Sequence, residues 1–233
     1  MTPTDLLACI AVMAIVHLGL AAWSVRGSGV AAVAAGWAFA TWRLHAAGTG
    51  WSELGLALPD PWWLLPLGVV ALYVTTTLAV GLIVGPLARA RRWPPPDTAH
   101  LGELRGNPRR LALLLSLAWT SAAFGEELVF RAFLQTGFEA AFGGGTAGLV
   151  AAIALQSVLF GAAHHRQGPR GVAQAMVVGS VFGVGYVLLD RNLWPLIVAH
   201  GLINTFSLVA IYAGADLRAA DGRDADTGAT RPD

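Results

Sequence analysis

The sequence predicts an all-α membrane protein, a polytopic bundle of about seven transmembrane helices, and three observations lead to this prediction. Of the 233 residues, 55% are hydrophobic and only 12% are charged. The mean hydropathy of +0.60 is higher than a soluble domain of this size usually has. The apolar residues also fall into separate runs, most of which approach the roughly 20 residues that a helix needs to cross a bilayer.

The predicted helices follow one another along the chain, the second and the fifth being short. Tryptophans flank several of the runs, as aromatic residues do at the membrane–water interface. The chain divides into N-terminal membrane helices with a loop (1–110), a helical core (111–213) and a polar tail (214–233), which we expect to be disordered and cytoplasmic. The predicted spans are residues 6–25, 30–46, 63–87, 111–133, 148–163, 171–189 and 193–213.

The charged residues predict the orientation and exclude one class of partner. All 15 positively charged residues are arginines, and with 14 acidic residues the net charge is +1, which argues against nucleic-acid binding. Cytoplasmic loops retain positive charge, and one side of the bundle holds little more than Arg43 and Arg191. We therefore expect an outer N-terminus and a cytoplasmic C-terminus in the inner (plasma) membrane, with lipids as partners. The arginines on the predicted cytoplasmic side are Arg26, Arg89, Arg91, Arg92, Arg105, Arg109, Arg110, Arg166, Arg170 and Arg218.

The fourth predicted helix carries a cluster of charged residues at membrane depth, where ionisable groups are costly and mark a functional interior by default. Glu126 and Glu127 are neighbours and point in different directions, whereas Glu127 and Arg131, at i and i+4, can pair on one face. This pairing leaves Glu126 without a fixed cation, as a general base or acid requires. The simpler interpretation is a structural ion pair with one spare carboxylate facing water.

Two later clusters also place polar side chains at i, i+4 spacing. His164 follows Phe160 by one helical turn and is a better candidate for an inward position than its neighbour His165. His200 and Asn204 share one face of the last apolar helix. That pair could join helices through hydrogen bonds, or it could donate hydrogen bonds to negative charge that develops on a carbonyl oxygen.

Together, Glu126-Glu127-x-x-x-Arg131, Phe160-x-x-x-His164 and His200-x-x-x-Asn204 resemble the signature of the CPBP family, in the same order on separate hydrophobic helices. This family comprises the CAAX-type prenyl endopeptidases, also called Rce1-like or Abi, and the bacteriocin-processing and immunity proteins. The resemblance covers roughly residues 111–213. The first three predicted helices resemble the family only in being hydrophobic.

The resemblance implies an intramembrane endopeptidase that hydrolyses a peptide bond of a membrane-associated protein or peptide. It implies that Glu126, with His164, activates a water molecule for attack on the peptide carbonyl. It further implies that His200 and Asn204 hold the oxyanion, while Glu127 and its arginine partner order the first motif.

A metal ion is also open as a cofactor, because members of this family have been described both as metalloproteases and as glutamate-type proteases. Glu126, His164 and His200 could bind zinc through oxygen and nitrogen. Since the chain has no helical motif with two histidines, we favour the metal-free scheme.

Two points stay open in the sequence. Straight, upright helices with a rise of about 1.5 Å per residue would place Glu126 in the outer half of the membrane and His164 near its cytoplasmic end, unless helices tilt or the fourth begins later than Leu111. Two other functions also fit: a non-catalytic immunity or scaffold protein of the same fold, and a proton-coupled carrier that uses Glu126 and the histidines as a relay.

Overall fold

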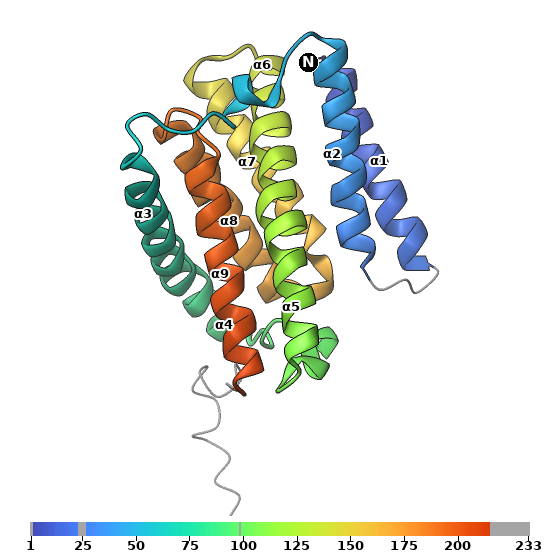
Figure 1. Cartoon of the computed structure of the whole chain (residues 1–233), viewed down its shortest axis with the longest axis vertical. Coiled ribbons are helices and arrows are strands. Elements are labelled where there is room, and N and C mark those ends of the chain that lie inside the picture. The colour runs from blue at the N-terminus through green and yellow to red at the C-terminus, as the bar shows by residue number, and fades with distance from the viewer. Residues whose placement is uncertain (1, 23–26, 98, 215–233) are drawn as a thin grey trace, which may run out of the picture.

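The protein is a bundle of membrane helices, as the sequence predicts. The structure, a computed structural model, describes residues 2–22, 27–97 and 99–214. Arg26, Arg218 and the predicted tail from residue 215 lie outside the described residues. Within them, every regular element is helical, and the helices run up and down past one another between two ends (Figure 1).

The described chain forms seven helical rods. Six of them are long and apolar enough to cross a membrane, while α2 is of similar length but less apolar. The rods are α1 (Pro3–Ala22), α2 (Ser28–Ala46), α3–η2–α4 (Leu64–Ala79, Val80–Val84, Gly85–Arg91), α5–η4–α6 (Pro108–Leu117, Ala118–Gln135, Thr136–Ala141), α7 (Gly145–Ala163), α8 (Gly168–Leu188) and α9 (Trp194–Tyr212). Short 3₁₀ turns, η1 (Trp51–Leu54), η3 (Ala99–Leu104) and η5 (His165–Gln167), lie in the connections.

The fourth rod is longer than the sequence pattern indicates. Asn107 caps its start by accepting a hydrogen bond from the Arg110 N–H at 3.1 Å, and Pro108 occupies the first turn, where no N–H is needed. The rod then continues for 34 residues to Ala141, past the predicted end at Phe133. The prediction stopped early because polar residues interrupt the apolar run, the first of them being Gln135, which is nevertheless completely buried.

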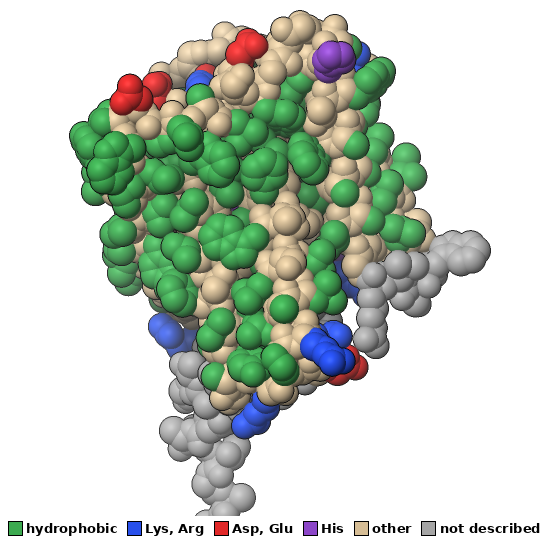
Figure 2. All heavy atoms as spheres, viewed as in Figure 1, with side chains coloured by type: hydrophobic (Ala, Val, Ile, Leu, Met, Phe, Trp, Pro, Cys, Tyr) green, Lys and Arg blue, Asp and Glu red, His purple; other side chains and the backbone are tan. Residues whose placement is uncertain are grey.

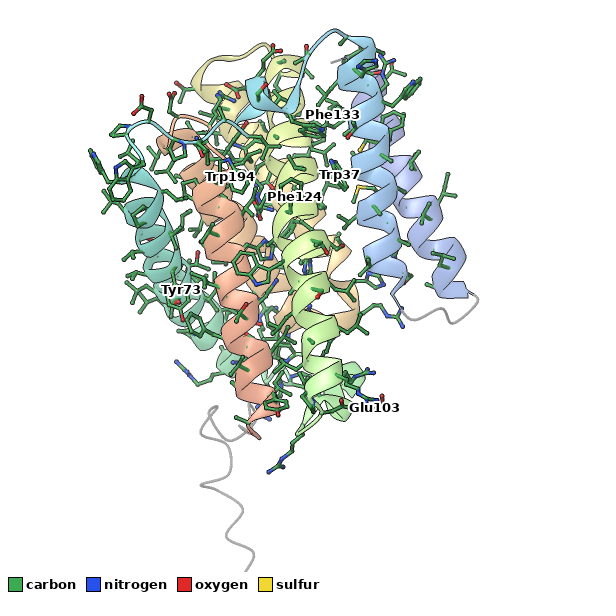
Figure 3. The ribbon with its side chains drawn as sticks, viewed as in Figure 1. Trp37, Tyr73, Glu103, Phe124, Phe133 and Trp194 are labelled. Carbon is green, nitrogen blue, oxygen red and sulfur yellow. The ribbon has the colours of Figure 1, made fainter. Side chains whose placement is uncertain are left out.

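The middle of this rod, η4, is the central post of the bundle. It is a π-helical segment, with wider turns than an α-helix. One hydrophobic core joins it to α1, α2, α6 and α7, and a second joins it to α3, α8 and α9. Gly125 allows α2 to approach closely, since a Cβ at this position would lie 2.8 Å from Val33 Cγ1. Next to it, the rings of Trp37 and Phe124 meet edge to face (Figure 3).

Charged side chains gather at the two ends of the bundle, and a hydrophobic band lies between them (Figure 2). The end that carries the C-terminal part of α9 also carries the arginines of α4 and the start of α5, including Arg89, Arg91 and Arg109. The opposite end carries Arg43 and Arg191, each paired with a carboxylate. The arginines named here therefore divide between the two ends as the sequence predicts.

The turn between α7 and α8 is recessed into the bundle. This bears on the difference in membrane depth that upright helices would give Glu126 and His164. In Figure 1 this turn lies behind α5 and ends well short of the level that α5 and α9 reach. The connection between α4 and α5 runs beneath it, and the Asp97 N–H donates to the Gln167 carbonyl at 3.2 Å. His164, at the end of α7, is therefore deeper than a residue at the end of an upright span would be.

In the loops at the end that carries Arg43 and Arg191, we expect Gly55 to be the position least tolerant of substitution. Its φ is +103°, its carbonyl accepts from the Leu193 N–H at 2.9 Å, and an added Cβ would overlap the backbone oxygen of Arg191. Gly55→Ala should therefore destabilise the protein by clearly more than the ~1–2 kcal/mol of a left-handed backbone alone. Gly48→Ala is the matched control, because Gly48 has a φ of +69° and open space around it. Equal losses in thermal unfolding temperature in detergent would contradict the prediction.

Candidate active site

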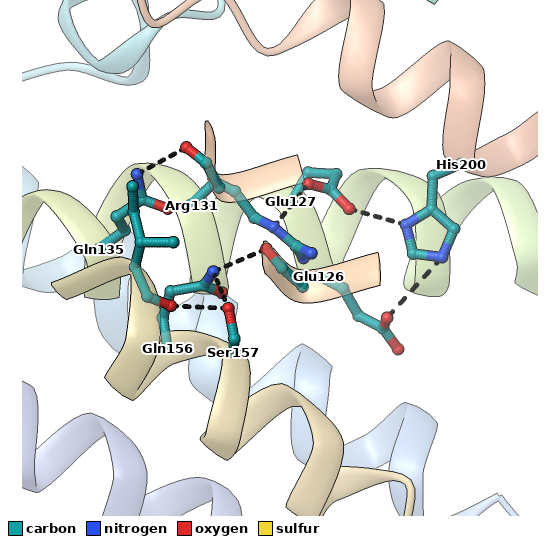
Figure 4. Close-up of polar contacts among 10 residues, drawn as sticks. Glu126, Glu127, Arg131, Gln135, Gln156, Ser157 and His200 are labelled. Atoms are coloured by element: carbon teal, nitrogen blue, oxygen red, sulfur yellow. Dashed lines mark hydrogen bonds and ion pairs between the residues drawn. The ribbon is translucent and has the colours of Figure 1, made fainter. Parts of the chain in front are cut away.

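A buried ion pair on η4 forms the base of the site (Figure 4). Arg131 Nε lies 3.2 Å from Glu127 Oε2, and both side chains are 0% exposed. The pair expected from the i, i+4 spacing is therefore present, and it is completely enclosed by protein. In such surroundings neither charge has water to replace its partner, so each depends on the other.

Two aromatic rings from neighbouring helices enclose the guanidinium of Arg131. It lies 4.4 Å from the ring centre of Phe160 on α7 and 5.5 Å from that of Phe182 on α8. Ring faces attract cations, most strongly where water is excluded. The arginine thus joins η4 to α7 and α8 and cannot move without disturbing both rings.

His200 on α9 lies between the two glutamates. Its Nδ1 is 2.7 Å from Glu127 Oε1, and its Nε2 is 4.0 Å from Glu126 Oε2. An ionised carboxylate can only accept a hydrogen bond, so Glu127 places the proton of this bond on Nδ1 and leaves Nε2 directed towards Glu126. One carboxylate, Glu127, therefore orients the histidine with one oxygen and neutralises Arg131 with the other.

Glu126 differs from its neighbour because it has no direct partner. Its Oε2 is buried and makes no hydrogen bond, and its side chain is 15% exposed, against 0% for Glu127. It is close enough to His164, His200 and Arg131 to interact with each of them electrostatically. Glu126 is thus the free carboxylate of the cluster, as the spacing predicts.

His164 reaches the same cluster from the end of α7. Its Nδ1 lies 2.8 Å from the Phe160 carbonyl oxygen, which can only accept, so Nδ1 carries the proton and Nε2 is the free nitrogen. Its ring also packs on the Phe160 ring with a centroid separation of 4.7 Å. Phe160 therefore contacts both Arg131 and His164, and its ring centre lies 6.4 Å from that of His200.

Asn204 is the one predicted site residue that the structure does not join to the others. It lies one turn beyond His200 on α9 and is partly exposed. Among the described residues its side chain makes no hydrogen bond. The adjacent Thr205 instead fixes this level of α9, because its hydroxyl accepts from Trp119 Nε1 at 3.1 Å.

Sequence reasoning missed two glutamines that extend the buried polar cluster. Gln135 donates to the Gly183 carbonyl at 3.0 Å, and Gln156 donates to the Gly179 carbonyl at 2.8 Å. Both side chains are completely buried. The signal was their spacing, since Gln135 follows Arg131 by four residues and Gln156 precedes Phe160 by four.

The residues considered for zinc do not form a metal-binding group as they stand. Within residues 2–22, 27–97 and 99–214, no three His, Cys, Asp or Glu side chains are close enough together to hold an ion. The free nitrogens of His164 and His200 could each serve as a ligand. We derive no step of the chemistry through a metal.

The hollows described in the bundle lie away from this cluster. One of about 300 Å³, at the end that carries Arg191, is lined by polar residues that include Glu53, Glu139 and Arg191. Another of about 360 Å³, between α3 and α8, is almost entirely apolar. The candidate site is therefore identified by the arrangement of its side chains and not by one of these hollows.

Comparison with known proteins finds a similarity, and it covers the part of the chain that contains this cluster. Residues 108–206 match the family model described as type II CAAX prenyl endopeptidase Rce1-like. The match begins with α5 and includes all three motifs, whereas α1 to α4 lie outside it. No curated protein and no solved structure matches the chain.

Removing the buried cation should destabilise the fold. Arg131→Met keeps an apolar stem between the rings but leaves the Glu127 charge without its cation, and breaking a buried pair in this way costs about 3–5 kcal/mol. We expect a large fall in thermal unfolding temperature. The double change Glu127→Gln with Arg131→Met removes both charges and should recover much of the loss. A double variant no more stable than Arg131→Met would show that the pair does not carry this stability.

Proposed function

We propose that the chain is an intramembrane endopeptidase that works by glutamate-activated water, and the match of residues 108–206 to the model of type II CAAX prenyl endopeptidases supports this proposal. The observation that carries the proposal is the convergence of one unpaired carboxylate, Glu126, with two oriented imidazoles inside the helical bundle. The substrate class is a membrane-associated protein or peptide, cleaved where the bundle admits water.

Glu126 is the proposed general base. It accepts a proton from water, and the resulting hydroxide attacks the carbonyl carbon of the scissile peptide bond. His164, whose free Nε2 belongs to the same cluster, orients this water and shares its proton. When the tetrahedral intermediate collapses, the proton passes to the leaving nitrogen, so one water and one peptide bond yield a carboxylic acid and an amine.

His200 is the proposed donor to the oxyanion. With Nδ1 bonded to Glu127, only Nε2 is available, and it donates to the oxyanion in the protonated ring. Asn204, one turn away on α9, would add its amide N–H once a substrate is bound, because catalytic hydrogen bonds often tighten only in the complex.

Glu127 and Arg131 act through His200 and not on the substrate. Both are enclosed by protein, and no oxygen of Glu127 is free to serve as a base. Their proposed role is to hold the histidine at a fixed angle, since an active site must be rigid to stabilise a transition state.

We also propose that the arginine-rich end faces the cytoplasm, which puts the C-terminus inside and the N-terminus outside. In a Cys9→Ala background, Ser52→Cys should react with a membrane-impermeant maleimide on intact spheroplasts, because Ser52 lies in the loop at the opposite end. Glu103→Cys, at the arginine-rich end, should react only after the membrane is broken. The reverse pattern of labelling would invert the orientation.

The catalytic roles predict graded losses of activity. Glu126→Gln and His164→Ala should abolish cleavage, while His200→Ala and Asn204→Ala should each lower turnover by about 10² to 10³, as the loss of an oxyanion donor does. Glu103→Gln is the matched control, since Glu103 is an exposed carboxylate far from the cluster. The assay is membrane proteomics of a deletion strain beside a Glu126→Gln strain, in which one precursor should accumulate in both.

The same strains separate the alternative functions. If the Glu126→Gln protein restores the phenotype lost on deletion, an immunity or scaffold protein that binds without cutting is favoured. If the purified protein moves protons or solute into liposomes, a carrier is favoured. Normal turnover by the Glu126→Gln protein would overturn the proposed mechanism.

A further inference from the structure

Helix α8 is held at two glycines by glutamines that come from two different helices (Figure 4). Gln135 of η4 donates to the carbonyl of Gly183 at 3.0 Å, and Gln156 of α7 donates to that of Gly179 at 2.8 Å. The two glycines are one helical turn apart, so both bonds reach the same stretch of α8. Because one bond comes from the helix with the glutamates and the other from the helix with His164, they connect α8 to both.

The bonds depend on the absence of side chains at these glycines. A Cβ at Gly183 would lie 2.7 Å from Gln156 Nε2 and 2.9 Å from Gln135 Oε1, so both amides lie directly over this residue. At Gly179 a Cβ would lie 3.0 Å from the Ser157 Cα, which is backbone and cannot turn aside. Each glutamine is completely buried, where a lost hydrogen bond is not replaced by water.

Between the two glycines, α8 carries the aromatic residue that touches the candidate site. Phe182 is 0% exposed, its ring centre lies 5.5 Å from the Arg131 guanidinium, and it lies 5.8 Å from the ring centre of His200 in an edge-to-face arrangement. A shift or rotation of α8 at Gly183 would move this ring against both side chains. The position of α8 is therefore coupled to the Glu127 bond that orients His200.

We propose that Gln135 and Gln156 are positioning residues for the active site. They fix α8 so that Phe182 confines Arg131 and His200, and this confinement keeps His200 Nδ1 on Glu127 and Nε2 towards Glu126. Neither glutamine touches the reacting atoms. The catalytic meaning of the inference rests on the proposed function, but the geometry that it assigns to His200 does not.

A spectroscopic measurement tests the inference without a substrate. In full-length protein labelled with ¹⁵N-histidine and placed in lipid vesicles, a short Nδ1–H bond to a carboxylate gives a low-field proton signal, which His200→Gln assigns by its loss. We expect the paired change Gln135→Leu with Gln156→Leu to remove this signal, as Glu127→Gln does by removing the charged acceptor. Ser180→Ala is the matched control and should retain it, because Ser180 lies between the same glycines but bonds only to its own helix and is exposed.

The outcomes separate positioning from general support of the fold. A paired glutamine variant that keeps the wild-type signal would overturn the proposal, and so would loss of the signal in Ser180→Ala. If the paired variant fails to fold, as judged by thermal unfolding, Gly183→Ala tests the proposal in its place. This change keeps both glutamine amides but displaces them from α8. Retention of the signal in Gly183→Ala would then overturn the proposal. Failure of the wild-type protein to cleave any peptide would count against the proposed function alone.

Discussion

The completely buried ion pair of Glu127 and Arg131 is the interaction on which the rest of the site depends. A charge at membrane depth is tolerated only when protein groups replace the water that it has lost. Here the Arg131 guanidinium has a carboxylate on one side and aromatic rings on two others. The second oxygen of that carboxylate accepts a hydrogen bond from His200. The requirement to neutralise one arginine therefore fixes the relative positions of η4, α7, α8 and α9, which carry the proposed catalytic residues.

Polar residues continue along η4 and α6 at intervals of four, and each has a partner of its own. Beyond the ion pair, Gln135 bonds to α8, and at the end opposite the arginines of α4 Glu139 holds Arg191 through contacts of 2.9 and 3.0 Å. Gln135 finds its partner on helix α8 and Glu139 finds its partner in the connection between α8 and α9, so this stripe of polar residues links η4 and α6 to other parts of the bundle. The hydrophobic residues of η4 point to the two cores on either side and supply most of the packing. Packing thus assembles the bundle, and the polar stripe sets its register.

The fold and most of the site could be predicted because helical spacing is a local property. The pairing of Glu127 with Arg131 and the isolation of Glu126 follow from positions four residues apart or adjacent on one helix. Contacts between helices carry no such signal: nothing in the spacing indicates that Glu127 also binds His200. The predicted end of the fourth helix failed for a related reason, since hydropathy treats a buried glutamine as if it faced water. The depth of His164 depends on how far the turn after α7 is recessed, which is set by packing and not by counting residues.

Two adjacent glutamates thus acquire opposite tasks through their surroundings alone. Both belong to the same helix and have the same chemistry, but a carboxylate with both oxygens engaged cannot accept a further proton without losing a partner, whereas an unpaired one can. Glu127 has two fixed partners at 2.7 and 3.2 Å, and Glu126 has none closer than the 4.0 Å contact with His200. A base for water must also be reachable by water, and of the two side chains only Glu126 has any exposed surface. Since adjacent residues of a helix point in different directions, the structural carboxylate and the reactive one can stand next to each other in the chain and still serve different parts of the site.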